Sequence, residues 1–545
     1  MSSKSIELEL LIEEGLDDGP GIINTDSSST ILEDDKRSLR RITGRVPRVA
    51  FLICLVELAE RGSYYSLTGC LTNFIQRPLP VGGNGTGAPS AHSQQNAGAL
   101  GLGLQWANVL YLMLIFLAYL TPIWGGFLSD SQLGKFKAVW TGTVICGVSH
   151  ILFILAALPI VLQEHRITGL VLIIIAIVVL ALGVGFIKPN LLPLLMDQYP
   201  HKNDFIMVLE SGEVVIVDRK ATLEKMSLIF YWSINVGCFF QFVTVLAEDR
   251  YGYWLAFSIP GMMYLLLPIV LIVVGPKLLI LPPGGSMFAD IVSVLKICYS
   301  TGWYRRFKDG TFWEYPSSRW DPQFVDDIKR TIDACKIFSF FVIFNVNDGS
   351  LGSIQTNQAG SLTRTTVPND FFSVLNPLTI LIMVPLQDYF LYPFCRKHNW
   401  NYTPQLKIFT GFILASIGSI IGAVLQYMVY QTSPCGYKAS TCEIGTQVSP
   451  ISAWWTSPVW ILPAVGECFA NVTAYELAYS RSPKRMQSLV FALFLASTSL
   501  SAVLGEICTI AAKDPYLVWP FAIFGIWGLV SATRFLRKFN NLHLE

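Results

Sequence analysis

The feature that most constrains this chain is a series of long apolar stretches that begins near residue 50. A helix needs about 20 predominantly apolar residues to cross the hydrocarbon core of a bilayer. Stretches of that length are predicted near residues 50–73, 104–127, 137–162, 167–195, 226–247, 254–275, 334–356, 371–393, 405–429, 453–478, 486–511 and 516–536. The pattern predicts an all-α polytopic membrane protein with about twelve transmembrane helices, because a helix satisfies its own backbone hydrogen bonds in lipid.

The charge content supports a membrane protein and argues against several other classes. Charged residues make up 14% of the 545 residues, whereas an ordinary soluble protein carries about 25%. The net charge of +1 lacks the basic excess of nucleic-acid binders. The 11 cysteines include no CxxC pair, and we find no histidine-rich metal set, nucleophile elbow or phosphate-binding loop. We therefore expect no enzyme, no metal, no organic cofactor and no nucleic-acid partner.

A polar segment at residues 276–333 divides the predicted spans into two sets of six. Within it, residues Asp326 to Lys336 have the pattern of an amphipathic helix, which would lie along the membrane surface. The predicted parts are a cytoplasmic disordered tail at 1–49, an N-terminal six-helix bundle at 50–275, a cytoplasmic linker at 276–333, a C-terminal six-helix bundle at 334–537 and a cytoplasmic tail at 538–545.

The distribution of Lys and Arg predicts the orientation of the chain. Cationic clusters fall on one side of the arrangement, and the positive-inside rule places that side in the cytoplasm. These clusters are the N-terminal tail, Lys135/Lys137, Arg305/Arg306, Arg396/Lys397, Arg481/Lys484/Arg485 and Arg534/Arg537/Lys538. Loops on the other side hold only isolated cations. Both termini are therefore expected in the cytoplasm.

Two features of the predicted outer loops depend on this orientation. Asn84-Gly85-Thr86 is a glycosylation sequon in a Gly-rich loop, so Asn84 is a candidate acceptor. Cys435 and Cys442 share another outer loop, where an oxidising environment permits a disulfide. A short loop need not supply the required geometry, so the sequence leaves this bridge open.

The densest group of ionisable residues inside a predicted span consists of Glu57, Glu60 and Arg61. An ionisable side chain costs about 2.5–3.5 kcal/mol at the centre of a membrane helix, so such residues are functional candidates. The spacing i, i+3, i+4 places all three on one helix face. Two carboxylates beside one guanidinium leave an excess negative charge, which a proton or another helix's cation can neutralise. Two interpretations remain: a proton-coupling site, or a static ion-pair cluster that holds helices together.

Further polar residues lie deep in other predicted spans. Lys188 is far from the ends of its span, so we expect it to face inward rather than to snorkel to the interface. Glu467 is either a functional carboxylate or a hydrogen-bonded packing group. Asn345 and Asp348 belong to an unusually polar stretch of the seventh span and are candidates for lining a cavity. Asn235 suits a polar substrate or a helix–helix hydrogen bond equally well.

Three short motifs lie in the N-terminal half of the chain. They are Glu57-x-x-Glu60-Arg61-x-x-Tyr64-Tyr65, Phe230-Tyr231-x-x-x-Asn235-x-Gly237 and Gly125-Gly126-Phe127-Leu128-Ser129-Asp130-x-x-x-Gly134-Lys135-Phe136-Lys137. The first resembles the highly specific ExxERxxYY signature of the proton-coupled oligopeptide transporters, a family of the major facilitator superfamily. The second resembles that family's fifth-helix motif, and the third resembles the superfamily's loop between spans two and three. The resemblance covers about residues 50 to 537, especially to fungal members.

This resemblance implies a fold and an activity. The implied fold is the major facilitator fold, with two six-helix bundles and a substrate site between them near the membrane midplane. The implied activity is import of di- and tripeptides by alternating access, with protons as the coupling ion. Short peptides, protons and the lipid bilayer are then the expected partners. A functional monomer in the plasma membrane is the corresponding expectation.

The resemblance also assigns roles to individual residues. The residues that would couple protons are Glu57, Glu60, Arg61 and, as alternate partner, Lys188. Those that would line the substrate pocket are Tyr65, Tyr119, Lys188, Asn235, Asn376 and Glu467. Those that would gate the cytoplasmic face are Asp130 and Lys135. Glu467 would meet the amino terminus of a peptide and Lys188 its carboxylate, so that opposite fixed charges hold a zwitterion.

Two departures from the family pattern keep other functions open. Gly62 stands where the family usually has an aromatic residue, and Thr68 stands where bacterial members carry a second arginine that faces the pocket. Without that arginine the clamp on a peptide carboxylate is weaker. The alternatives are a symporter of another small anion or peptide-like metabolite, and a nutrient receptor that binds ligand without transporting it.

Overall fold

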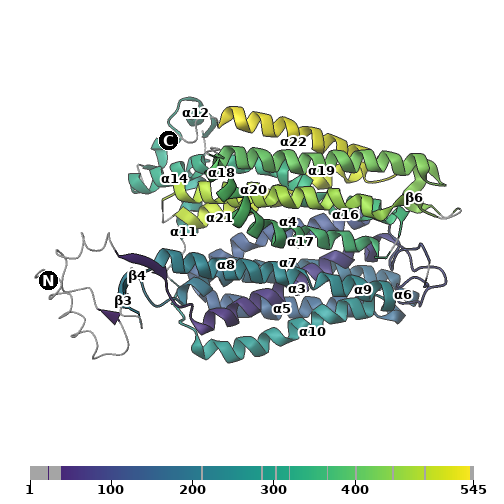
Figure 1. The fold of residues 1–545 in the computed structure, drawn as a ribbon, viewed down its shortest axis with the longest axis horizontal. Coiled ribbons are helices and arrows are strands. Elements are labelled where there is room, and N and C mark those ends of the chain that lie inside the picture. The colour runs from purple at the N-terminus through teal and green to yellow at the C-terminus, as the bar shows by residue number, and fades with distance from the viewer. Residues whose placement is uncertain are drawn as a thin grey trace, which may run out of the picture.

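The computed structural model describes residues 22–23 and 39–539, except for residues 92, 210–212, 284–286, 301–302, 318–319, 365, 399–401, 443, 445–446 and 484–485. Most of the predicted tail at 1–49 and of the tail at 538–545 therefore lies outside the described residues. Figure 1 shows two sets of long helices stacked on each other, with the N-terminal half of the chain in purple to teal and the C-terminal half in green to yellow.

The N-terminal bundle occupies the predicted region, and its helices are packed pairwise around one apolar core. Its elements are α3 (Arg48–Gln76), α4 (Leu104–Leu128), α5 (Lys135–Ala156), the short α6 (Pro159–Glu164), α7 (Arg166–Asp197), α8 (Arg219–Cys238), α9 (Gln241–Tyr251) and α10 (Tyr253–Val274). The most extensive packing is between α5 and α7, α4 and α7, α3 and α8, and α3 and α10. Helix α3, which carries the charged cluster, is thus covered on two sides by other helices.

The C-terminal bundle has two apolar cores and is less regular along its first span. Its elements are α15 (Phe338–Asn345), α16 (Gly352–Gly360), α17 (Leu375–Leu386), α18 (Tyr392–Lys397), α19 (Pro404–Thr432), α20 (Ser457–Arg481), α21 (Gln487–Ile507) and α22 (Val518–Lys538). A π-helical turn at Val346–Ser350 joins α15 to α16. Helix α19 packs against α20 and α22, while α21 crosses to α4 of the N-terminal bundle.

The number of spans agrees with the prediction of about twelve. Ten helical segments of the described residues are long and apolar enough to cross a membrane. Helices α3, with 29 residues, and α20, with 25 residues, are also long enough to cross a membrane, but polar residues interrupt their apolar sequence. These two helices contain the ionisable residues Glu57, Glu60, Arg61 and Glu467, and they complete the set.

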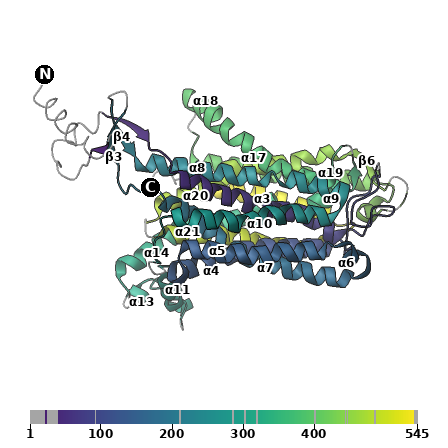
Figure 2. The same cartoon turned by 90° about the horizontal axis from the view of Figure 1, so that it is seen from below.

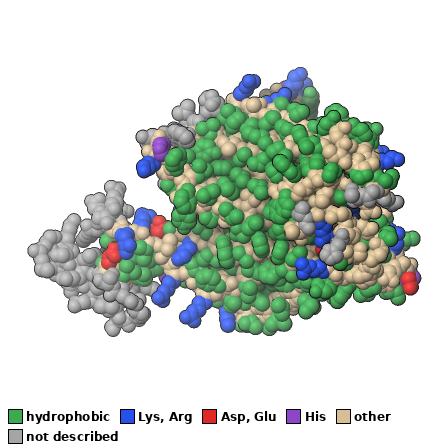
Figure 3. All heavy atoms as spheres, turned by 45° about the vertical axis from the view of Figure 1, so that its right-hand side comes forward, with side chains coloured by type: hydrophobic (Ala, Val, Ile, Leu, Met, Phe, Trp, Pro, Cys, Tyr) green, Lys and Arg blue, Asp and Glu red, His purple; other side chains and the backbone are tan. Residues whose placement is uncertain are grey.

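The outer surface and the two ends of the molecule differ in chemistry. Apolar side chains cover the face drawn in Figure 3, and the blue and red charged side chains gather toward its ends. Exposed apolar side chains on the long helices include Trp232, Met262 and Ile272. An exposed apolar belt on helices of spanning length is the surface that lipid covers, so the chain is an integral membrane protein.

We call the two ends of the bundle the tail end and the disulfide end. Figures 1 and 2 place the β3–β4 strands and the linker helices at the tail end, and α6 and β6 (Ser449–Ser452) at the opposite, disulfide end. Helix α3 begins and α22 ends at the tail end. The first and last described spans therefore reach the same side of the molecule.

A small sheet at the tail end includes part of the predicted disordered tail. Strands β3 (Phe205–Val208) and β4 (Val214–Asp218) form an antiparallel hairpin between α7 and α8. Strand β2 (Arg40–Thr43) pairs in parallel with β4, and β1 (Ile22–Ile23) pairs with β3, giving the order β1-β3-β4-β2. Residues 40–43 are thus ordered, because their backbone hydrogen-bonds to the edge of a hairpin between two predicted spans.

The linker contains α11 (Met287–Cys298), α12 (Trp303–Lys308), α13 (Glu314–Ser317) and α14 (Pro322–Ala334). Helix α14 begins four residues before the predicted amphipathic helix, because the Asp321 side chain accepts a hydrogen bond from the Gln323 amide and Pro322 occupies the first turn. Its apolar face, with Val325 and Ile328, is buried against α11 and the start of α21. The expectation that this face lies on the membrane surface is therefore wrong, since protein covers it.

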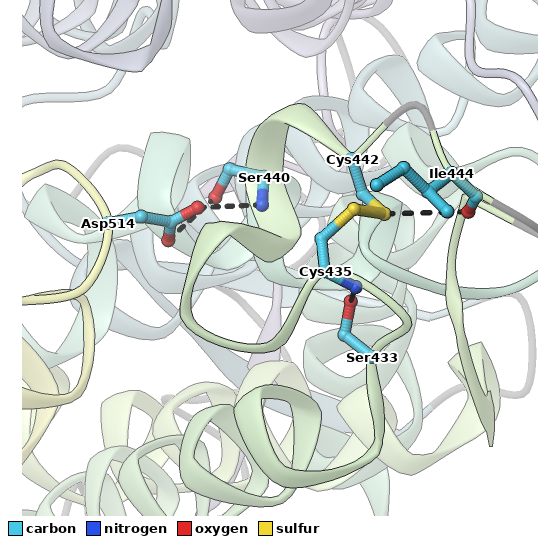
Figure 4. The surroundings of a disulfide bond; sticks show 6 residues. All are labelled: Ser433, Cys435, Ser440, Cys442, Ile444 and Asp514. Carbon is cyan, nitrogen blue, oxygen red and sulfur yellow. Dashed lines mark hydrogen bonds between the residues drawn. A yellow bond between two sulfur atoms is a disulfide. The ribbon is translucent and has the colours of Figure 1, made fainter.

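At the disulfide end, Cys435 and Cys442 form a disulfide with their Cα atoms 5.5 Å apart (Figure 4). The loop between them is held to the α21–α22 connection. The Ser440 amide and hydroxyl donate to the carboxylate of Asp514 at 2.8 Å and 3.1 Å. The Tyr430 hydroxyl of α19 donates to the same carboxylate. The bridge that the sequence left open is thus part of a compact cap.

Candidate functional site

The charged cluster of α3 is buried within the N-terminal bundle. The exposed fractions of Glu57, Glu60 and Arg61 are 5%, 1% and 5%. The Arg61 guanidinium contacts the Glu60 carboxylate, and its Nε lies 3.4 Å from Oε1 of Glu57. One oxygen of Glu60 and one terminal nitrogen of Arg61 have no hydrogen-bond partner among the described residues. With both carboxylates ionised, the cluster would carry one more negative than positive charge, and it retains unused hydrogen-bonding capacity.

The lysine predicted to face inward lies beside this cluster. Lys188 of α7 interacts electrostatically with Glu57, Glu60 and Arg61. Its ammonium lies 3.5 Å from the centre of the Tyr119 ring of α4, a cation–π contact. Within the described part of the chain, no carboxylate is within ion-pair distance of this ammonium. Lys188 is thus a cation close to two carboxylates and is not bound to either.

Two carboxylates from the C-terminal bundle complete the set. Asp348 lies in the π-helical turn between α15 and α16, and its carboxylate interacts electrostatically with that of Glu467 in α20. Tyr119 of the N-terminal bundle is an electrostatic neighbour of both. One Asp348 oxygen has no hydrogen-bond partner in the described structure. π-Helical turns within α-helices are frequent at functional sites because they re-aim side chains.

These side chains face a common space between the bundles. Lys188, Tyr119, Tyr65, Glu467 and Asp348 are all partly exposed, although they lie in the middle of helices of spanning length. Tyr119 of the N-terminal bundle has Glu467 and Asp348 of the C-terminal bundle as electrostatic neighbours, so these side chains come together where the two bundles meet. Asn376, near the start of α17, is also partly exposed. A cation on one bundle and carboxylates on the other match the opposite charges of a zwitterion.

This chain is similar to known proteins over most of its length. The sequence model described as the POT family matches residues 136–522. This chain belongs to the POT family. Peptide transporter PTR2 of Candida albicans is 44% identical over 529 residues, covering 93% of this chain and 84% of the relative. The MFS-type transporter ucsM of Acremonium sp is 42% identical over 501 residues, covering 90% and 83%.

A solved structure of the POT family has the same fold. The crystal structure of the POT family transporter PepTSo has a TM-score of 0.71 with this chain at 18% identity, over 92% of this chain and 99% of that chain. The two-bundle arrangement in Figure 1 is therefore the POT fold, as the sequence predicted. At 18% identity this likeness shows the fold alone, so the roles of individual residues are inferred from the geometry of this chain.

The glycine that departs from the family pattern lies at a close helix contact. A Cβ atom at Gly62 would lie 2.6 Å from the terminal methyl of Met263 and 3.1 Å from the Gly237 carbonyl oxygen of α8. An aromatic side chain cannot fit there without separating α3 from α8. In this POT protein, Gly62 thus allows the charged helix to pack closely on the helix of the second motif. Thr68 donates to the Tyr65 carbonyl in its own helix and supplies no cation.

Two predicted polar residues are engaged in helix contacts. The Asn235 amide donates to the Tyr231 carbonyl one turn earlier at 2.9 Å, and the side chain is buried. The Asn345 amide reaches Thr498 of α21 at 3.1 Å. This contact joins α15 to α21. Of the predicted polar stretch in the seventh span, Asp348 is the residue that faces the space between the bundles.

The two residues predicted to act in gating lie just before and at the start of α5. Lys135, at the start of α5, forms an ion pair with Asp197 at the end of α7, with an Nζ–Oδ2 distance of 2.5 Å. Asp130 is exposed in the π-helical turn Ser129–Leu133 that precedes α5. The sequence analysis missed Asp197. An acidic residue at the same membrane end as the motif's lysine was the signal that could have revealed it.

The predicted glycosylation acceptor is part of the loop's own structure. Asn84 is exposed, but its side-chain amide donates to the Tyr251 carbonyl at 3.0 Å and its side-chain oxygen accepts from the Thr86 amide at 2.9 Å. This arrangement fastens the loop to the end of α9. Modification of Asn84 would require its amide to leave Tyr251.

Polar contacts that the sequence analysis did not foresee join the bundles at the disulfide end. The Asn73 amide of α3 donates to the Asn369 side chain at 2.8 Å, and the Gln76 amide donates to the Asn357 side chain of α16 at 2.5 Å. All four residues are buried. Two amides spaced three residues apart at the end of the first predicted span were the available signal, because they occupy one helix face if the helix continues.

An ion pair and a further amide contact extend this junction. Arg364 contacts Asp249 of α9 through both terminal nitrogens, with an Nη1–Oδ1 distance of 2.6 Å. The Gln241 amide donates to the Ser373 hydroxyl at 2.5 Å. Each contact joins a residue of the N-terminal bundle to one of the C-terminal bundle. The structure therefore represents a state in which the disulfide end is closed.

Proposed function

We propose that this POT family member imports di- and tripeptides together with protons, by alternating access between its two bundles. The observation that carries the proposal is the position of Tyr119, whose ring contacts the Lys188 ammonium and which is also an electrostatic neighbour of Glu467 on the other bundle. A peptide zwitterion presents one carboxylate and one ammonium, which these residues match. The name of the Candida albicans relative, Peptide transporter PTR2, supports the same substrate class.

Proton coupling is assigned to the α3 cluster. A proton bound at Glu57 or Glu60 removes the excess negative charge, whereas without the proton Lys188 can approach and compensate it. The two arrangements place the α7 lysine differently relative to α3. A ligand shifts a conformational equilibrium only through different affinity for the two states, and such a charge exchange supplies that difference. The unused hydrogen-bonding capacity of Glu60 and Arg61 is consistent with this role.

The orientation is proposed from two observations that agree. A disulfide at Cys435–Cys442 is expected in an oxidising compartment. The opposite end carries the predicted cationic clusters. The disulfide end then faces the exterior, both termini lie in the cytoplasm, and the present structure is closed toward the exterior. The plasma membrane and a functional monomer are part of this proposal, which includes no cofactor besides the proton.

A second candidate function is transport of another small anion or peptide-like metabolite. It is motivated by Thr68, whose hydroxyl is bound to its own helix and leaves Lys188 as the cation of the predicted carboxylate clamp. The relative ucsM, described as an MFS-type transporter, is nearly as similar as PTR2 and its name specifies no substrate.

A competition panel separates these functions. We expect unlabelled di- and tripeptides to inhibit uptake of labelled dialanine into proteoliposomes at concentrations at least about tenfold lower than N-acetylated dialanine, nitrate or organic acids. Losing one charge-assisted contact to the amino group accounts for a factor of that size. Equal inhibition by an organic acid and by dialanine would favour the second candidate. Labelled peptide that binds without entering the vesicles would indicate a receptor.

A further inference from the structure

Two fully buried carboxyl groups meet where the bundles touch at the disulfide end. Glu248 belongs to α9 of the N-terminal bundle, and Asp370 to the 3-10 turn Asn369–Val374 that precedes α17 of the C-terminal bundle. Both have an exposed fraction of 0%. Their carboxyl groups lie within hydrogen-bonding reach of each other. The Asn73 amide lies near Asp370 and the Cys70 thiol near Glu248, but within the described residues neither meets the geometry of a hydrogen bond to any of the four oxygens.

The charges around this pair leave it one proton short of neutrality. Arg77, at the end of α3, is the nearby cation and interacts with Asp370. Asp249, next to Glu248, is already paired with Arg364. The other titratable groups that face the pair are neutral in their ordinary forms: the thiol of Cys70 in α3 and the phenol of Tyr253 in α10. Two ionised carboxylates beside one guanidinium would therefore leave an uncompensated negative charge.

Such a charge is costly in a buried site, and a proton is the smallest ligand that removes it. Two adjacent carboxylates in a low-dielectric site cannot both ionise cheaply, so one proton becomes shared between them. A shared proton also supplies the missing donor, because a protonated carboxyl donates to its neighbour. Arg77 disfavours a metal cation at the same place through charge repulsion.

We propose that Glu248 and Asp370 bind one shared proton and that this proton allows the disulfide end to close. This inference rests on the alternating-access function proposed above. When the bundles separate at this end, each carboxyl group reaches water and can ionise by itself. Protons on that side then favour closure, because they bind the closed state more tightly than the open one. The Glu248–Asp370 site lies at the disulfide end, where the two bundles touch. It is separate from the α3 cluster around Glu60.

The test is a distance measurement across the disulfide end of the full chain in lipid nanodiscs, without peptide and without a pH gradient. A ketone-bearing amino acid replaces exposed Val81 in the N-terminal bundle and exposed Tyr437 in the C-terminal bundle, and each is spin-labelled, so the native cysteines stay untouched. We expect the open fraction of wild type to rise at least about threefold between about pH 5.5 and about pH 8.5.

Two variants should remove this rise. In Asp370→Asn and in Glu248→Gln, the new amide donates to the remaining carboxylate without a titratable proton, so the open fraction should change by less than about 1.5-fold over the same range. Asp249→Asn is the matched control at the same end. It breaks the ion pair with Arg364 and should raise the open fraction at both pH values while the pH-dependent rise persists.

The outcomes separate this site from the proposed function. A wild-type distance that does not respond to pH overturns the proposal, and this measurement does not depend on the folding of any variant. A full pH response in both Asp370→Asn and Glu248→Gln also overturns it. Because no peptide is present, a chain that opens with pH but moves no peptide would contradict the transport function and leave the shared-proton site standing.

Discussion

The Glu60→Gln variant is expected to lose acid-driven accumulation of peptide while it keeps peptide exchange. Glutamine has nearly the same shape as glutamate, but its amide does not titrate in the physiological pH range. The buried contact with Arg61 therefore becomes independent of proton concentration. If one proton moves with each peptide, a pH gradient of about one unit supports about a tenfold accumulation. In the variant, the ratio of internal to external peptide concentration should stay at about one, because peptide then only equilibrates across the membrane.

The measurement is uptake of labelled dialanine into proteoliposomes with an imposed pH gradient, beside exchange at equal pH and equal peptide concentration. Exchange needs no net proton movement, so it reports a folded, binding-competent chain. The matched control is Glu224→Gln, an exposed carboxylate near the start of α8, which should accumulate peptide like wild type. Concentrative, acid-stimulated uptake by the Glu60→Gln variant would contradict the assignment of proton coupling to the α3 cluster.

The Glu467→Gln variant is expected to weaken peptide binding by about 30-fold or more. In the proposed complex this carboxylate faces the peptide's ammonium group across the cavity from Lys188. Removing one partner of a buried charge pair costs about 2–5 kcal/mol, and about 2 kcal/mol corresponds to roughly a 30-fold change in dissociation constant. The effect should be much smaller for N-acetylated dialanine, which lacks the ammonium group.

Calorimetric binding of both ligands to the purified protein checks this prediction. Glu476→Gln, which changes an exposed carboxylate on the same helix, is the control for a general effect on α20 and should bind dialanine like wild type. If Glu467→Gln weakens dialanine and N-acetylated dialanine equally, the carboxylate acts on the structure of the cavity and does not recognise the amino terminus.

The sequence predicted the spans well because their length is set by the bilayer. It was less informative where partners decide the structure. The four residues of β2 show no usable periodicity, and their strand exists because the β4 edge lies beside them. The apolar face of α14 has the same pattern whether lipid or protein covers it, and here α11 covers it. The earlier start of that helix was readable from Asp321 and Pro322, a capping residue followed by proline.

The same distinction applies to the candidate site. Glu57, Glu60 and Arg61 share one helix, so helical spacing alone placed them on one face. Partners on different helices depend on tertiary packing that spacing does not contain. For this reason the sequence pointed only to Asp130 and Lys135 of one motif, whereas the ion-pair partner of Lys135 is Asp197 of α7. The meeting of Glu248 and Asp370 from different bundles was invisible for the same reason.

The central claim is that peptide and proton cross the membrane together. Its most direct test records proton flux in reconstituted proteoliposomes when an inward peptide gradient is imposed at equal pH on both sides. With charge compensation by a potassium ionophore, dialanine entry should acidify the vesicle interior in wild type and should cause no acidification in Glu60→Gln. Dialanine entry into wild-type vesicles without acidification would contradict this account.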